Sequence, residues 1–350
     1  MRFTKTLSVL AVLTSAALLL LAGCGPSVDT GYSSNTGSNN TGGGSTGGTL
    51  TGLGYTWEVE TSGTTTDLRS VCYGASRWVA VGTSAGVGVT AESTDGKSWT
   101  LTQQNSVADY YLHNVGCGNN TFVALASTAI IYSGDGVNWT QASVPSSNGS
   151  TPYPQAIAAV TYGNGLWVAV DDLFLTENGW GFLTSTDGAS WSETLIGGAY
   201  AQPTAIAYGN GLYVVVGYGG LLLTSPDGTN WTNRSFTTGQ AMLGITYANG
   251  MFVAVANNGQ ILTSPDGINN WNAYSVSSGA LNAVGYGGGI FLAVGASSGG
   301  TAYVSTDGVS WTSASSYLPS GLYGAALNGA AYGNTSFVVV GDSGEIGLSH

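Results

Sequence analysis

Aspartates that recur at a fixed spacing are the first residues of this sequence to consider for chemistry. They lie in six copies of the pattern S-x-D-G-x-x-W, and the fifth copy contains one additional residue before its tryptophan. In a hairpin turn, aspartate accepts hydrogen bonds from backbone N–H groups, glycine supplies positive φ and tryptophan covers the turn. We therefore assign all six to the fold and not to catalysis: Asp95, Asp135, Asp187, Asp227, Asp266 and Asp307.

Several common catalytic and metal-binding patterns do not occur in the sequence. The two histidines are His113 and the terminal His350, and neither belongs to an H-E-x-x-H motif. The sequence also lacks C-x-x-C, the phosphate-binding G-x-x-x-x-G-K-[ST] loop and the D-x-D-x-D-G calcium loop. We therefore expect no catalytic residue, no metal and no cofactor.

The repeats predict an all-β fold of short strands. Each unit of about 40 residues contains four β-rich runs separated by Gly/Asn turns, which is typical of one four-stranded antiparallel propeller blade. The tryptophan of the pattern recurs from Trp99 to Trp311, whereas Trp57 has no S-x-D-G before it. The chain ends on strand-like Ile346-Gly347-Leu348-Ser349, where another copy would begin. We predict seven blades, the last closed by the N-terminal strand; the alternative is six blades with loose ends.

The six copies resemble the BNR or Asp-box repeat of sialidase-like and sortilin-like β-propellers and of the photosystem II assembly factor family. The resemblance covers nearly everything after residue 55 and implies a propeller. The assembly-factor family implies seven blades and a chaperone that binds a photosystem subunit through an arginine-rich face. Only Arg69, Arg77 and Arg234 follow the first 23 residues, so this sequence lacks such a face.

Glycoside hydrolysis is the enzymatic alternative. Sialidase-like proteins hold the substrate carboxylate with three arginines from different blades, and bidentate pairing explains that choice. The positions of Arg69, Arg77 and Arg234 in their units do not predict such convergence. Other glycosidases need two carboxylates about 5 to 10 Å apart. Asp171, Asp172 and Glu177 supply acids in one insertion, but an ordinary polar loop in an acidic protein is the favoured interpretation.

The N-terminus predicts export and lipid anchoring. Arg2 and Lys5 precede an apolar run, and Leu21-Ala22-Gly23-Cys24 resembles a bacterial lipobox, which implies cleavage after residue 23 and lipidation of Cys24. An ordinary signal peptide is the alternative. Residues 24–54 are rich in Gly, Ser, Thr and Asn, a composition typical of a flexible tether, and residues 55–350 form the propeller. We expect a bacterial outer-membrane or cell-surface location.

Charge and composition narrow the partners. The sequence has 6 basic and 18 acidic residues, and 2 of the basic residues lie in the signal, which leaves 4 against 18 and a net charge of −14. Such a surface repels nucleic acid and anionic lipid, so neither is an expected partner of the propeller. We predict a non-catalytic, membrane-anchored scaffold that binds a protein or glycan outside the cytoplasm.

Candidate binding residues come from aligned inner strands and from long loops. One row of the innermost strands contains Arg69, His113, Ala158, Thr204, Leu243, Asn282 and Asn328, of which five are polar. This row is either a ligand site at one mouth of the central channel or a lining that satisfies backbone groups. The loops at the propeller end opposite the Asp-boxes carry further candidates: Tyr153, Asp171, Asp172 and Trp180.

Two cysteines lie in equivalent inner strands of the first two units. Cys72 and Cys117 are one position apart in the repeat. A disulfide is permitted outside the cytoplasm if the Cα atoms lie within about 7 Å. Two buried free thiols are the alternative.

Overall fold

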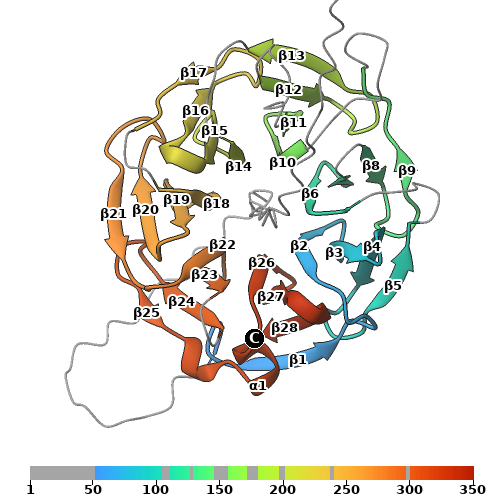
Figure 1. Ribbon diagram of the computed structural model, residues 1–350, viewed down its shortest axis with the longest axis vertical. Helices are drawn as coiled ribbons and strands as arrows, with labels where there is room; N and C mark the ends of the chain where they lie inside the picture. Colours follow the sequence, from blue (N-terminus) through green and yellow to red (C-terminus); the bar gives the residue numbers. More distant parts are fainter. Residues whose placement is uncertain are drawn as a thin grey trace, which may run out of the picture.

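A computed structural model of the chain describes residues 52–104, 111–126, 129–145, 157–171, 180–196, 202–236, 240–296 and 300–350. Seven antiparallel four-stranded sheets surround a central axis (Figure 1). The predicted seven-bladed propeller, with its last blade closed by the N-terminal strand, is confirmed. Three predicted positions lie outside the described residues, namely Cys24, Tyr153 and Asp172, as does the side chain of Trp180.

In blades 1 to 6 each strand pairs with the next one in sequence, and the chain runs from the axis to the rim; in blade 7 three consecutive strands do so and β1 adds the outer strand (Figure 1). Blade 1 contains β2 (Leu68–Gly74), β3 (Arg77–Ser84), β4 (Val87–Ser93) and β5 (Thr100–Gln103), and blade 2 contains β6 (Asn114–Gly118), β7 (Thr121–Leu125), β8 (Ile130–Ser133) and β9 (Thr140–Gln141). Blade 3 contains β10 (Ile157–Gly163), β11 (Leu166–Asp171), β12 (Trp180–Ser185) and β13 (Ser192–Ile196). Blade 4 contains β14 (Pro203–Gly209), β15 (Leu212–Gly217), β16 (Leu222–Ser225) and β17 (Thr232–Asn233).

Blades 5 to 7 complete the ring. Their strands are β18 (Met242–Ala248), β19 (Met251–Ala256), β20 (Gln260–Ser264), β21 (Asn272–Ser275); β22 (Ala280–Gly287), β23 (Ile290–Ala296), β24 (Thr301–Ser305), β25 (Thr312–Ser313); and β26 (Leu327–Gly333), β27 (Ser336–Gly341), β28 (Glu345–Ser349), β1 (Trp57–Thr61). Short 3-10 segments follow β15 and β27: η2 (Tyr218–Gly220) and η4 (Asp342–Gly344). Before β26 lie η3 (Ser315–Tyr317) and the one-turn helix α1 (Ser320–Tyr323).

Each Asp-box forms the turn between the third and fourth strands of a blade. In blade 4, Asp227 Oδ1 accepts from the N–H groups of Thr229 (2.9 Å) and Asn230 (2.8 Å). Ser225 Oγ accepts from Gly228 N (2.8 Å), and Trp231 Nε1 donates to Gly228 O (3.1 Å). These bonds satisfy the backbone of a tight turn, which is the structural role that the sequence predicts for the motif.

The seventh Asp-box is divided between the two ends of the chain. Ser349 Oγ accepts from Gly54 N (2.7 Å), as Ser225 Oγ does from Gly228 N, and Trp57 Nε1 donates to Gly54 O (3.0 Å). The missing carboxylate is replaced by the carbonyl of Gly52, which accepts from Tyr55 N and Thr56 N at 2.9 Å each. Five residue pairs, Trp57↔Ser349 to Thr61↔Glu345, then join β1 to β28.

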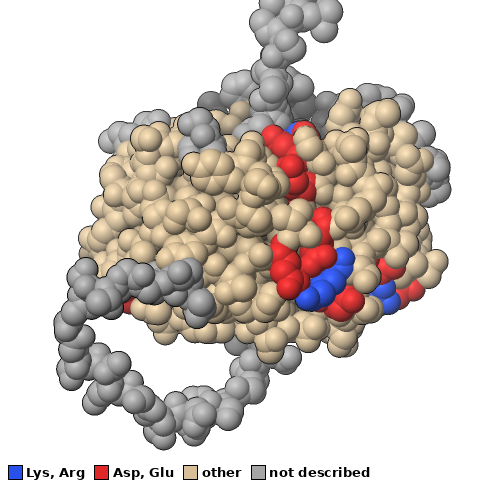
Figure 2. Space-filling model, turned by 90° about the horizontal axis from the view of Figure 1, so that it is seen from below, with Lys and Arg blue, Asp and Glu red and all other residues tan. Residues whose placement is uncertain are grey.

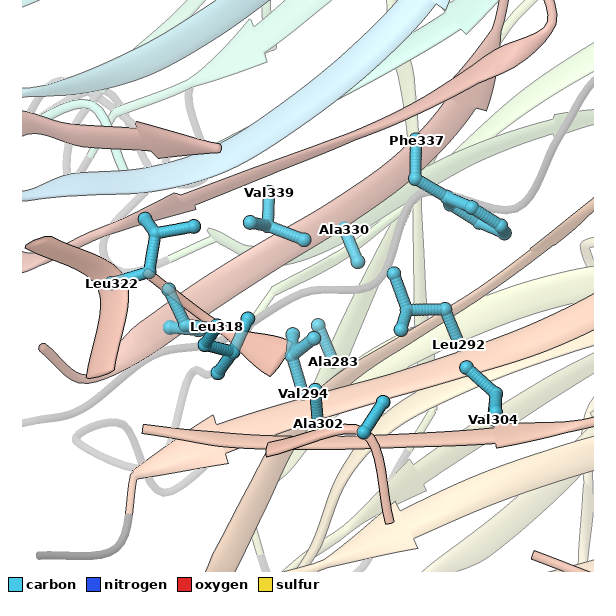
Figure 3. Close-up of a cluster of buried hydrophobic side chains, with 12 residues drawn as sticks. Ala283, Leu292, Val294, Ala302, Val304, Leu318, Leu322, Ala330, Phe337 and Val339 are labelled. Carbon is cyan, nitrogen blue, oxygen red and sulfur yellow. The ribbon is translucent and has the colours of Figure 1, made fainter. Parts of the chain in front are cut away.

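Small residues allow the blades to pack closely. Most inner strands end with Tyr-Gly, and a side chain at the glycine would collide with the tyrosine of the next blade, as at Gly163 and Tyr208. Farther from the axis, apolar side chains fill the space between neighbouring blades. Figure 3 shows this between blades 6 and 7, where Leu292 and Val294 lie near Phe337 and Val339. Because both faces of the inner strands are covered, those strands are almost continuously apolar.

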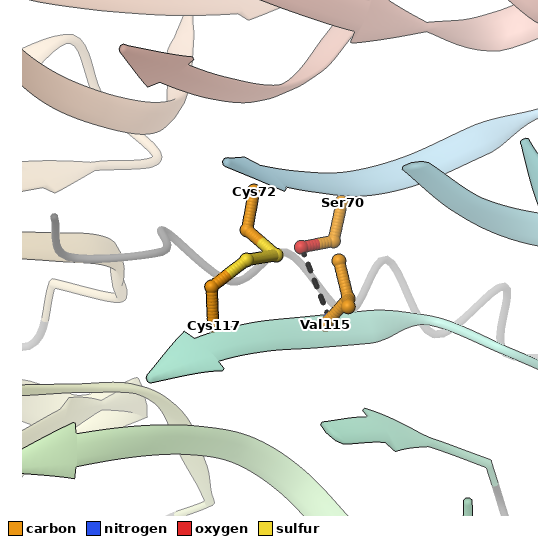
Figure 4. Close-up of a disulfide and its surroundings, with 4 residues drawn as sticks. All are labelled: Ser70, Cys72, Val115 and Cys117. Carbon is orange, nitrogen blue, oxygen red and sulfur yellow. Dashed lines mark hydrogen bonds between the residues drawn. A yellow bond between two sulfur atoms is a disulfide. The ribbon is translucent and has the colours of Figure 1, made fainter. Parts of the chain in front are cut away.

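Blade 2 carries Cys117 at the repeat position that is tyrosine in the other blades, and Cys117 forms a disulfide with Cys72 of blade 1. The two Cα atoms are 6.0 Å apart, within the range that a disulfide can bridge. Beside this bond, Val115 N donates to Ser70 Oγ (3.3 Å), so a covalent and a polar contact join the same two strands (Figure 4).

Candidate functional site

The candidate row of the inner strands coincides with a structural irregularity. In six blades the residue of this row is skipped in the pairing between the first two strands, which marks a β-bulge. In blade 2, His113 lies immediately before β6, and its backbone N–H donates to Leu125 O (3.1 Å). We call these seven residues the bulge row: Arg69, His113, Ala158, Thr204, Leu243, Asn282 and Asn328.

Four side chains of the bulge row cross to the next blade and bind a backbone carbonyl. Thr204 Oγ1 donates to Met242 O (2.5 Å), Asn282 Nδ2 to Leu327 O (3.0 Å) and Asn328 Nδ2 to Leu68 O (3.1 Å). His113 Nε2 lies 2.5 Å from Ile157 O. In each case the acceptor belongs to the residue just before the bulge of the following blade. These side chains therefore clamp neighbouring blades together.

Burial agrees with this clamping role. Asn282 and Asn328 are 0% exposed, Thr204 is 1% exposed and His113 is 8% exposed. Two alternatives were open for this row from the sequence: a ligand site, or a channel lining whose side chains satisfy backbone groups. The observed hydrogen bonds are those of the second alternative, and ligand binding by these four residues stays an untested prediction.

Arg69 differs from the other polar members of the row. Its guanidinium Nη2 donates to Asp67 Oδ2 (2.7 Å), and its side chain is 26% exposed. Asp67 Oδ1 also accepts from Ser343 N of η4 (3.1 Å), so the pair connects blade 1 with blade 7. Arginine carries five N–H donors, and this ion pair uses one of them. Asp67 was not among the predicted site residues, although its position two residues before Arg69 was a usable signal.

His113 is held between two carbonyl oxygens. Nδ1 lies 3.1 Å from Tyr111 O, and Nε2 faces Ile157 O of blade 3. Burial lowers the pKa of His113, and the positive charge of Arg69 lowers it further. Together these effects outweigh the two carbonyl contacts, which raise the pKa. Asn114 was not predicted from the sequence either. Its Oδ1 accepts from Val160 N (3.3 Å) and adds a second bond between blades 2 and 3.

Exposed aromatic residues lie at the same end of the propeller. We call this end the loop face. Its described part includes Arg69 and Tyr111, where inner strands begin, Asn257, where a second strand ends, and Tyr323 of α1, beside the start of β24. Tyr111 is 58% exposed and Tyr323 is 51% exposed. Asp171, at the end of β11, is fully buried and lies opposite Ile157. Arg69 and Tyr111 therefore form the accessible part of the candidate site.

The other two arginines of the propeller are engaged elsewhere. Arg77 forms an ion pair with Glu92 within blade 1, and Arg234 Nε donates to Thr224 Oγ1 (3.2 Å) in blade 4. The three arginines thus bond within their own blades, and the described residues do not show an arginine cluster.

Acidic side chains gather near the closing blade. Figure 2 shows a band of Asp and Glu on the side that carries β1 in Figure 1. Here Glu58 binds Lys97 (2.6 Å), which lowers the pKa of Glu58, whereas burial and the nearby Glu58 raise the pKa of Glu60.

Among the described residues, no three His, Cys, Asp or Glu side chains come together as a metal site requires. In the same part of the chain, no helix has the length and apolarity to cross a membrane.

The comparisons with known proteins support the fold. A family model described as the DUF6242 beta propeller domain matches residues 146–283, and no curated protein matches the chain. The structure of YCF48 bound to D1 peptide has a TM-score of 0.65 and 17% identity, covering 86% of this chain and 97% of that one. YCF48 from Cyanidioschyzon merolae has a TM-score of 0.62 and 17% identity, with 84% and 98% covered.

Virginiamycin B lyase from Staphylococcus aureus is also similar, with a TM-score of 0.68 and 12% identity over 84% of this chain and 99% of the lyase. An assembly factor and a lyase share this architecture, so the likeness alone does not select a function. The chain is a β-propeller similar in fold to YCF48, a photosystem II assembly factor, and to virginiamycin B lyase.

Proposed function

We propose that the protein is a non-catalytic, membrane-anchored scaffold that binds a protein or glycan partner outside the cytoplasm through its loop face. The observation that carries the proposal is the different state of Arg69. The other four polar side chains of the bulge row are buried and bind the next blade, whereas Arg69 is partly exposed and retains unused donors. A partner carboxylate can pair with it, because guanidinium recognises carboxylate in a forked geometry.

A protein partner is the better supported of the two classes. The exposed rings of Tyr111 and Tyr323 provide large contact areas at low conformational cost, as tyrosine does in many protein interfaces. A similar propeller, YCF48, has been solved with a bound peptide. The lipobox-like Leu21-Ala22-Gly23-Cys24 supports the proposed anchor, and such an anchor would place this surface outside the cytoplasm.

The glycoside hydrolase alternative has weaker support. Sialidase-like binding of a carboxylate requires arginines from several blades around one point, and here Arg77 and Arg234 bond within their own blades. A hydrolase would also need two facing carboxylates. Asp171 is buried, whereas its sequence neighbour Asp172 lies outside the described residues.

A pull-down from native membranes, run beside a glycan array, tests the proposal. Arg69→Gln and Tyr111→Ala should each reduce capture at least tenfold. Arg77→Gln is the matched control, since it removes an equally charged side chain paired with an acid away from the loop face. Capture that survives in both loop-face variants would contradict the proposed surface, and turnover of an arrayed glycan would identify an enzyme.

A further inference from the structure

The inter-blade clamps differ in one chemical respect. Thr204, Asn282 and Asn328 donate from hydroxyl or amide groups, whose hydrogens are present at every physiological pH. His113 occupies the same repeat position, but its donors depend on protonation. Among the described clamps of the bulge row it is therefore the member that acidification can change.

The surroundings of His113 leave it with one hydrogen for two acceptors. Both ring nitrogens face carbonyl oxygens, of Tyr111 at 3.1 Å and Ile157 at 2.5 Å. A neutral ring carries a single N–H, and the shorter contact places it on Nε2, toward blade 3. The lone pair of Nδ1 then points at Tyr111 O. An imidazolium would donate to both oxygens.

Charged groups from several elements surround this ring. Arg69 of β2 acts on it electrostatically, and Asp67 is the ion-pair partner of Arg69. Across blade 3, Asp171 lies opposite Ile157 on β11. Leu125 of β7, which accepts the backbone N–H of His113, is not ionisable.

We propose that His113 is a proton-controlled clamp that makes the loop face sensitive to acid. In the neutral state, His113 binds blade 3 through Nε2 and leaves Tyr111 and Arg69 unperturbed. In the protonated state, Nδ1 also donates to Tyr111 O, and the new charge repels Arg69 of the adjacent blade. The inference rests on the proposed function only in that Tyr111 and Arg69 are the contact residues; the clamp itself does not need a partner.

The direction of the stability change follows from burial. Because the folded pKa is below the ordinary value of 6.5, the unfolded chain binds the proton more readily. The stability that neutral His113 contributes is therefore present above pH 6.5 and is lost as the pH falls below it.

Titration of ¹⁵N-histidine in the intact protein by NMR tests the proposal. The chain has two histidines, and His350→Gln identifies the signal of His113. We expect the Nε2–H tautomer at neutral pH, a His113 pKa below 6.5 and a rise of that pKa in Arg69→Gln. The amide signal of Leu112, adjacent to Tyr111 O, should shift with the same midpoint.

His113→Asn is the matched variant, because asparagine occupies this position and binds the equivalent carbonyl in blades 6 and 7. The melting temperature of wild type relative to this variant should fall between pH 7.5 and pH 5. A His113 pKa at or above 6.5, or a pH-independent difference, would overturn the clamp. If the clamp titrates as expected but partner capture is unaffected by Arg69→Gln and Tyr111→Ala, the proposed contact surface fails and the clamp stands.

Discussion

Replacing Ser349 with alanine should release the N-terminal strand from the ring. Ser349 is 0% exposed, and its Oγ is the acceptor for Gly54 N at 2.7 Å. A buried N–H that loses its acceptor costs about 1–3 kcal/mol. In this blade the cost falls on the contact between β1 and β28, which no turn of the chain connects. A change of that size corresponds to about a 5- to 150-fold change in an opening equilibrium.

Hydrogen exchange on the intact propeller provides the measurement, with urea unfolding as the global check. In Ser349→Ala, amide exchange should accelerate along the whole of β1, from Trp57 to Thr61, because the strand opens as a unit. The free energy of unfolding should fall by about 1–3 kcal/mol. Faster exchange confined to Gly54 would mean that strand pairing alone holds the closure.

Ser225→Ala is the matched control. Ser225 Oγ makes the equivalent bond to Gly228 N, in a turn through which the chain is continuous. The control should lose a similar amount of stability, with faster exchange limited to the turn between β16 and β17. The reasoning is refuted if exchange of β1 in Ser349→Ala is unchanged, or if β17 in the control opens as readily.

Three further outcomes are expected. Cys72→Ser/Cys117→Ser should cost about 4 kcal/mol in urea unfolding, because cross-linking residues 45 apart restricts the unfolded chain; a loss below about 1 kcal/mol would contradict this. Ala158→Asn should raise stability by about 0.5–1.5 kcal/mol in thermal unfolding by adding the clamp that blade 3 lacks, and destabilisation would contradict it. Backbone N–H groups lower the pKa of Asp95 and Asp307 from 3.8 to about 2. The stability that these ionised carboxylates contribute should therefore disappear as the pH falls from 3.8 toward 2. In Asp95→Asn/Asp307→Asn the free energy of unfolding should depend less on pH in this range.

The architecture was predictable because the repeat records it directly. Each S-x-D-G-x-x-W marks one turn, and the unpaired Trp57 and the strand before His350 indicate a shared blade. The chemical detail of the closure was not predictable. Gly52 replaces an aspartate through its main-chain carbonyl, and a backbone acceptor leaves no signature in the side-chain pattern.

The candidate site was predictable in position and less so in chemistry. Aligning the inner strands places Arg69 and His113 in one row, and the structure shows that this row is a β-bulge. Whether a side chain of this row reaches the next blade depends on the distance between the blades. That distance results from packing of the whole ring and cannot be predicted from the residues of one repeat. The distance between blades also decided the pairing of Cys72 with Cys117, whose Cα separation of 6.0 Å lies within the range that a disulfide can bridge.

Departures from the repeat are the positions at which we propose that function is located. A position that is occupied alike in most blades serves the ring, as the turn aspartates and the inner-strand tyrosines do. Three departures adjoin the same pair of blades: Cys117 in place of a tyrosine, a titratable clamp at His113, and Arg69, which pairs with Asp67 and does not cross to the next blade. The disulfide joins the same two inner strands, three residues after Arg69 and four residues after His113. If a partner binds at the loop face and His113 titrates as we propose, the partner would meet two strands that a disulfide joins and a charge that depends on pH.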